Sequence, residues 1–197
     1  MEMKNIKTTF YDNGGVIKAS KLHENKVSKY EIKKLVDENV IERISKGYYK
    51  LTDDDISDIK LISILLPGAI ICFDSALFLY GYSDRTPVKW HLAVDKNISK
   101  SKVNMKYPYI KPYYIDKSIL NIGVEEILVE DVRMKIYSRE KLICDCLKYE
   151  SKMDVEIFNK AIISYIKDPK KNIPKLMEIA KKRKVEKKVY DKIGVWL

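Results

Sequence analysis

The spacing of hydrophobic and polar residues predicts short helices near the N-terminus. Met3, Ile6 and Phe10 recur at helical spacing, which predicts a helix over residues 3–11 that ends at Gly14. A second short helix is expected over residues 18–23, followed by a tight turn. The first part of the chain is therefore predicted to be helical.

A third helix has a well-marked start. Ser28 is a candidate N-cap and Glu31 stands three residues later, so each side chain can accept a hydrogen bond from a free backbone N–H as a capping box. Val27 and Ile32 have the spacing of a hydrophobic staple, and Asn39 can end the helix in the left-handed conformation. The helix is thus predicted to begin at Ser28, with only a narrow apolar stripe.

Two short strands follow, over residues 41–45 and 48–51, joined at Lys46-Gly47. Two helices joined by a turn and followed by a basic hairpin are the layout of a winged helix-turn-helix, which we expect over residues 1–52. In such motifs the second helix of the pair enters the major groove of DNA and the hairpin lies along the backbone.

The residues expected to face DNA come from the third helix and the hairpin: Ser28, Lys29, Tyr30, Lys33, Lys34, Arg43, Lys46 and Tyr48. Lysine is a point charge that meets phosphate more often than a base edge, so we expect affinity to depend steeply on salt. Any solvated helix also carries exposed lysines, and winged folds also contact proteins. A protein-interaction or ligand-sensing regulator that does not touch DNA is therefore the alternative.

The remaining residues, 53–197, are predicted to form an α+β domain with a helical C-terminal part, so the fold class is α+β. Thr52 resembles an N-cap, which predicts a helix from there to about Leu66. Further helices are expected at 75–80, 139–150, 154–165, 173–182 and 186–193, and strands at 69–73, 90–94, 109–115, 124–129 and 134–137.

The charge distribution adds a second basic region. The net charge is +10, divided as +4 over residues 1–52, −1 over 53–166 and +7 over 167–197. This pattern favours polyanion contact by the two ends of the chain. Additional phosphate contacts are expected from Lys18, Lys21, Lys181, Lys182, Arg183 and Lys184.

No apolar run approaches the length of a membrane span, and the N-terminus lacks the apolar segment of a signal peptide. The three cysteines do not form a disulfide framework. We therefore expect a soluble cytoplasmic protein without membrane contact.

Little in the sequence points to catalysis or metal binding. His23 and His91 have no ligand-type residue at metal spacing, and there is no Gly-rich phosphate loop, so we expect no cofactor, no metal and no enzymatic activity. On the helix over 139–150, Cys146 joins the apolar face and Cys144 is expected to point away from it. An alternative is a nuclease that uses the acidic residues near Lys135: Glu125, Glu126, Glu130 and Asp131.

The segments 15–22, 27–36 and 41–49 together resemble the N-terminal winged helix of the AbiEi antitoxins. Residues 73–81, 84–87, 90–94 and 136–145 are similar to later parts of the same family, so the resemblance covers about two-thirds of the chain. The sequence departs from the family pattern at Lys18, where a Thr or Ser cap is common, and at the turn over residues 25–26 and at Asn39, where glycines are usual.

The resemblance implies a DNA-binding antitoxin that represses its own operon by binding inverted repeats in double-stranded DNA. It also implies a functional partner, a toxin of the nucleotidyltransferase fold, which such antitoxins oppose in type IV systems without a stable complex. The setting that the resemblance implies is phage defence by abortive infection.

Overall fold

The computed structural model describes residues 3–194, with side chains from Ile6 onward, and the chain divides into two compact units. Unit 1 comprises residues 1–67 and 98–109, and unit 2 comprises residues 68–97 and 110–197. Both units combine helices with a sheet, so the predicted α+β class is confirmed. No helix of the described part is both long and apolar enough to cross a lipid bilayer.

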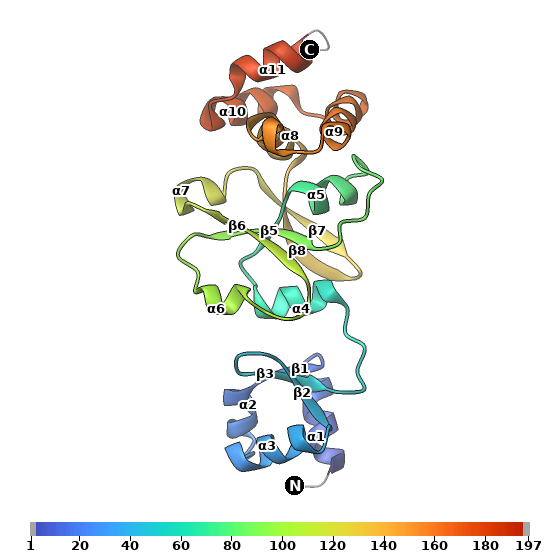
Figure 1. Cartoon of the computed structure of the whole chain (residues 1–197), viewed down its shortest axis with the longest axis vertical. Helices are drawn as coiled ribbons and strands as arrows, with labels where there is room; N and C mark the ends of the chain where they lie inside the picture. The colour runs from blue at the N-terminus through green and yellow to red at the C-terminus, as the bar shows by residue number, and fades with distance from the viewer. Residues whose placement is uncertain (1–2, 195–197) are drawn as a thin grey trace. The chain divides into compact units, whose positions relative to one another are not determined.

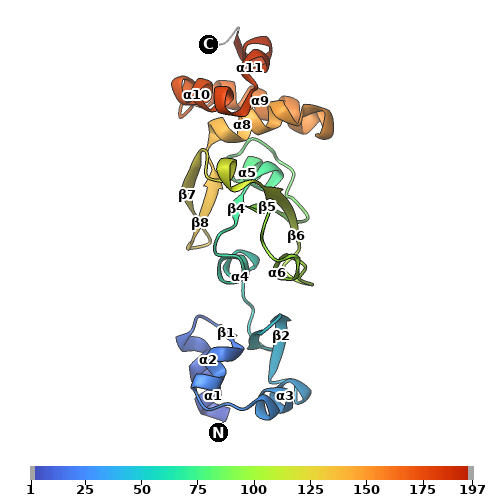
Figure 2. The same cartoon turned by 90° about the vertical axis from the view of Figure 1, so that its left-hand side faces the viewer.

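Unit 1 begins with helices and a three-stranded antiparallel sheet in the strand order β1-β3-β2 (Figures 1 and 2). The elements are α1 (Met3–Asp12), β1 (Val16–Lys18), α2 (Ala19–Glu24), α3 (Lys29–Asp37), β2 (Ile41–Ser45) and β3 (Tyr48–Leu51), followed by α4 (Asp58–Leu65) and α6 (Lys100–Val103). The first six elements share a core of nine buried side chains, from Ile6 to Leu51. β1 and the short α6 were not predicted.

The polypeptide between β3 and α4 differs from the prediction. Thr52 does not cap a helix: α4 begins six residues later with Ser57 at its N-cap, and the Thr52 hydroxyl is buried without a hydrogen-bond partner. Lys50 explains the difference, because its Nζ donates to the carbonyls of Leu51 (3.2 Å) and Asp54 (2.7 Å). These bonds hold the segment in a turn where a helix was expected.

Unit 2 is built on a five-stranded mixed sheet in the order β6-β5-β4-β8-β7. The strands are β4 (Ile70–Ile71), β5 (Trp90–Asp95), β6 (Ile110–Ile115), β7 (Val124–Val129) and β8 (Val132–Tyr137). β5 pairs with β6 and β4 with β8 in parallel, whereas β4–β5 and β7–β8 are antiparallel. The central strands β4 and β5 are buried, as expected for the core of a sheet covered by helices.

Helix α8 (Arg139–Lys148) is the centre of the helical part of unit 2 (Figure 1). It contacts α5 (Phe73–Leu79), α9 (Val155–Lys167), α10 (Ile173–Arg183) and α11 (Glu186–Ile193), and every residue from 140 to 147 is buried. Cys144, which was expected to point away from the apolar face, is buried as Cys146 is, because other elements of unit 2 cover both sides of α8. The short α7 (Lys117–Leu120) was not predicted.

Asp168 ties the end of α9 to the rest of unit 2. Its carboxylate accepts hydrogen bonds from the Tyr82 hydroxyl (2.6 Å), Arg139 Nε (2.8 Å) and the Lys170 N–H (2.7 Å). Burial raises the pKa of Asp168, but these three donors outweigh it and hold the pKa below its ordinary value.

We therefore expect Asp168 to stabilise unit 2 at neutral pH and to lose this effect in acid. A carboxyl whose pKa is lowered by folding contributes its stability above the unfolded pKa, about 3.9, and loses it as the pH falls through the folded pKa. The difference in free energy of unfolding between the parent chain and Asp168→Asn, measured by urea titration, should shrink between about pH 6 and about pH 3. A difference that does not change with pH would contradict this, and Asp191→Asn, at an exposed aspartate, is the control.

Candidate nucleic-acid interface

The start of α3 is fixed by the capping box predicted from the sequence. Ser28 Oγ accepts from the Glu31 N–H (3.2 Å), while Glu31 Oε2 accepts from the Ser28 N–H and hydroxyl (both 2.8 Å). These bonds from Ser28 lower the pKa of Glu31. Both donors of Ser28 are thus used within the cap and a carboxylate lies at the helix N-terminus, so we assign Ser28 a structural role instead of the expected phosphate contact.

We expect Ser28→Ala to lower the free energy of unfolding by about 1 kcal/mol, the usual cost of losing an N-cap side chain. Urea unfolding followed by circular dichroism would measure the loss. Ser20→Ala, at an exposed serine inside α2, is the matched control and should change stability by less than about 0.5 kcal/mol. Equal effects of the two substitutions would show that the cap contributes nothing.

Cations from two elements meet at one hollow of unit 1. Lys29 and Lys33 from α3 and Arg43 from β2 line a hollow of about 370 Å³, together with His23 and Tyr49. α3 contacts β2, which is why residues distant in sequence converge there (Figure 2). All three cations are exposed, and among the described residues none has a carboxylate partner. The hollow is therefore a site of uncompensated positive charge.

The side of α3 that faces away from the hairpin is less basic than the side that borders it. Tyr30 is 78% exposed and projects from the helix, but Lys34 lies 3.8 Å from Glu38 and Asp37 is also exposed. Positive charge on α3 is thus concentrated at Lys29 and Lys33, on the side that borders the hairpin.

A second group of predicted residues lies at the hairpin turn. The Ala19 N–H donates to the Gly47 carbonyl (2.8 Å), and the β1–β3 register sets Lys18 opposite Tyr48. Lys18 Nζ is 5.9 Å from the centroid of the half-buried Tyr48 ring, within range of a cation–π contact. Lys46 at the turn and Lys21 on α2 are exposed.

His23 has a structural role in the turn between α2 and α3, as its lack of ligand-type neighbours in the sequence indicated. Its Nδ1 lies 2.7 Å from the Val27 carbonyl and so holds the turn between α2 and α3. Lys26 in that turn adopts a φ of 64°, the left-handed region that glycine would enter freely. The four-residue spacing of His23 and Val27 could have signalled the contact, but only with the turn geometry known.

The C-terminal cations divide into exposed and buried members. Lys181, Lys182 and Lys184 are exposed, and Lys182 pairs with Glu178 at 2.6 Å. Arg183 is only 4% exposed, and its Nε and Nη2 lie 3.0 and 2.7 Å from Asp145 Oδ1. The prediction that Arg183 contacts phosphate was wrong, because this side chain faces α8 inside unit 2.

The acidic residues of the nuclease alternative are dispersed. Glu125 and Glu126 alternate along β7 and so face opposite sides of the sheet, where they pair with Lys175 and Arg133. Glu130 and Asp131 form the tight turn between β7 and β8, with φ of 49° and 62°. Within the described part of the chain, no three His, Cys, Asp or Glu side chains are grouped so that they could hold a metal ion.

Comparison of the chain with protein-family models found no match, and none of the curated proteins matches it. The candidate interface is therefore defined by its residues alone.

Proposed function

We propose that unit 1 binds double-stranded DNA as a winged helix-turn-helix. In this arrangement α3 lies in the major groove and the β2–β3 hairpin lies along the backbone. The observation that carries the proposal is the convergence of Lys29, Lys33 and Arg43 at one hollow, exposed and without carboxylate partners in the described chain. Such uncompensated charge beside an exposed helix favours a polyanion as the ligand.

Phosphate contacts provide most of the affinity in this proposal. α3 contains three lysines and no arginine, and lysine lacks the planar fork that reads guanine in a bidentate manner. Lys29, Lys33 and Arg43 at the hollow and Lys18, Lys21 and Lys46 near the hairpin turn make about six contacts. Log affinity should therefore fall with log salt with a slope of about −5.

Lys33→Ala tests the interface most directly. If Lys33 contacts phosphate, its loss removes one released counterion and makes the salt slope less steep by about 0.9. Gel shifts on the upstream promoter at several salt concentrations would measure the slope, with Lys135→Ala, an exposed lysine of β8 in unit 2, as the control. An unchanged slope and affinity would remove Lys33 from the footprint.

The biological role that we propose is that of an antitoxin and autorepressor in a type IV abortive-infection operon, opposing a nucleotidyltransferase-fold toxin. This part of the proposal is supported by the residues that resemble the AbiEi antitoxins, in segments 15–22, 27–36 and 41–49 and in unit 2. Co-expression with the neighbouring reading frame tests it. The antitoxin role fails if the neighbour is harmless alone, or is equally toxic with and without this chain.

One observation favours a second candidate, a winged-helix module that binds a protein. Tyr30 is a large exposed aromatic side chain on α3, and amphipathic aromatic residues are frequent at protein interfaces. The two candidates are separated by the same gel shifts at about 0.15 M salt, since a protein-binding module would not retard promoter DNA once salt screens general charge attraction.

A further inference from the structure

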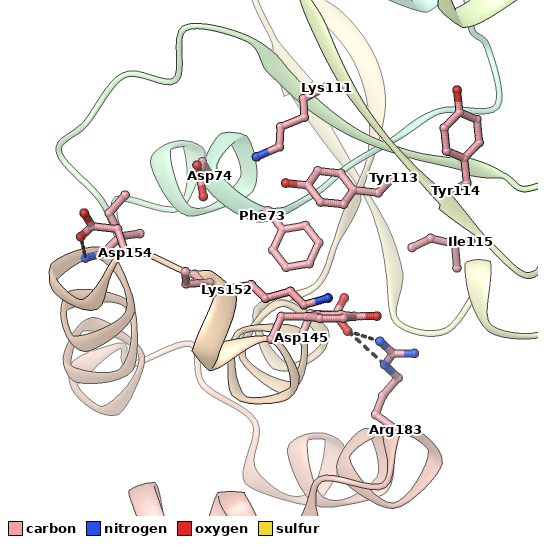
Figure 3. Close-up of a pocket in the computed structure, with 13 residues that line it drawn as sticks. Phe73, Asp74, Lys111, Tyr113, Tyr114, Ile115, Asp145, Lys152, Asp154 and Arg183 are labelled. Atoms are coloured by element: carbon pink, nitrogen blue, oxygen red, sulfur yellow. Dashed lines mark hydrogen bonds and ion pairs between the residues drawn. The ribbon is translucent and has the colours of Figure 1, made fainter. Parts of the chain in front are cut away.

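Unit 2 contains a pocket of about 450 Å³. None of its lining residues belongs to the candidate DNA interface of unit 1. One wall is β6 with Lys111 and Tyr113, and the facing wall is the segment after α8 that carries Lys152 (Figure 3). Its size falls within the range of small-molecule sites.

Three aromatic rings contribute to the apolar part of the pocket. The Phe73 ring lies 4.5 Å from the Tyr113 ring and 5.7 Å from the Tyr149 ring, centroid to centroid. Phe73 adopts a φ of 40°, a conformation that is costly for a bulky side chain and is found mainly where function requires it. The Phe73 ring is 7% exposed and packs against both tyrosines, so the half-buried rings of Tyr113 and Tyr149 offer the aromatic surface to a planar ligand.

Two uncompensated cations reach the same space. The ammonium groups of Lys111 and Lys152 lie on either side of the Phe73 ring (Figure 3), and neither has a carboxylate partner among the described residues. Lys111 Nζ is 5.6 Å from the Tyr113 ring centroid and Lys152 Nζ is 6.0 Å from that of Tyr149. Both side chains are exposed, so their flexible stems are free to turn onto one anionic group.

Two of the three acids of the pocket wall already have cationic partners, one of which, Arg183, also lines the pocket. Asp145 pairs with Lys141 and Arg183, and Asp154 lies 3.3 Å from Arg85 Nη1. Asp74 is the exception.

The Asp74 carboxylate is 3.7 Å from His91 Nε2. Burial lowers the pKa of His91, so this ring is uncharged at neutral pH and leaves the carboxylate without a cationic partner. The pocket therefore offers two free cations, one free hydrogen-bond acceptor of negative charge, and aromatic surface.

We propose that this pocket binds a nucleoside monophosphate. The base packs against the aromatic rings, one of its N–H donors reaches Asp74, and the phosphate is held by Lys111 and Lys152. Inorganic phosphate alone would leave the rings and Asp74 unused, and an uncharged aromatic compound would leave both lysines unused. The assignment does not depend on DNA binding by unit 1.

Isothermal titration of the full chain with AMP and with GMP tests the proposal. We expect at least one of them to bind with a dissociation constant below about 1 mM, and inorganic phosphate, ribose 5-phosphate and the uncharged nucleoside to bind at least about tenfold more weakly. Absence of saturable binding by both nucleotides would overturn the proposal. So would equal binding of inorganic phosphate.

Variants locate the site. Lys111→Ala and Lys152→Ala should each raise the dissociation constant about tenfold, because each removes a charge-assisted hydrogen bond. Both residues are exposed, so the fold should be retained, which circular dichroism can verify. Lys135→Ala, on β8 outside the pocket, should have no effect. Unchanged binding by the double variant Lys111→Ala/Lys152→Ala would place the nucleotide elsewhere and overturn the assignment.

Discussion

Asp145→Ala is expected to lower the free energy of unfolding by about 3–5 kcal/mol, the usual cost of removing one partner from a buried ion pair. Asp145 is the single carboxylate between Lys141 and Arg183, and the three side chains are no more than 4% exposed. Without it, two cations remain in the core of unit 2. Burial already lowers the pKa of Lys141 even with Asp145 in place. Without Asp145, Lys141 can release its proton and become neutral, and this limits the loss of stability to the range given.

Urea unfolding followed by tryptophan fluorescence would measure this loss, since Trp90 lies in β5 of unit 2. Asp191→Ala, which removes an exposed aspartate from α11, is the matched control and should cost less than about 0.5 kcal/mol. A loss below about 1 kcal/mol for Asp145→Ala would mean that the two cations find water or another partner without the carboxylate.

The second large effect is expected on DNA affinity. Replacing Lys29, Lys33 and Arg43 together with alanine should weaken binding roughly 500-fold at about 0.1 M salt, because each lost phosphate contact costs a factor of about eight there. The salt slope should change from about −5 to about −3. Fluorescence anisotropy with promoter DNA at several salt concentrations would measure both values.

A control with the same change in net charge separates a local interface from general attraction. The triple variant Lys117→Ala/Lys135→Ala/Lys167→Ala removes three exposed lysines of unit 2 that lie outside the candidate DNA interface and outside the pocket. We expect it to bind DNA within about threefold of the parent chain. If the two triple variants lose affinity equally, the hollow between α3 and β2 is not the interface.

Local signals in the sequence predicted the part of unit 1 from Ser28 to Leu51 well. The Ser28–Glu31 capping box, the left-handed Asn39 (φ 56°) and the Gly47 turn (φ 77°) all depend on residues within a few positions of one another. For the same reason the predicted bounds of the two hairpin strands, residues 41–45 and 48–51, agree with those of the structure. Interactions of this range are encoded in the local sequence, so periodicity and capping rules suffice to find them.

The errors arise where a distant partner decides the outcome. The basic run at the end of α10 suggested an exposed cationic face, but Arg183 pairs with Asp145, which is 38 positions away. Thr52 is the exception, since the partner there is local: Lys50 bonds to the carbonyls of Leu51 and Asp54 and so holds that segment in a turn. The pocket of unit 2 was missed altogether, since Lys111 and Lys152 are brought together only by the packing of β6 against the helical part.

The three cysteines of unit 2 are protected from thiol reagents by the fold. Cys72, Cys144 and Cys146 are all buried in unit 2 and unpaired, and burial raises the pKa of each thiol, to about 12 for Cys144. Only a thiolate that reagents can reach reacts with alkylating agents and oxidants at an appreciable rate. Native unit 2 therefore does not react with these reagents at an appreciable rate. The rate at which its cysteines are alkylated measures how often the unit unfolds far enough to expose them.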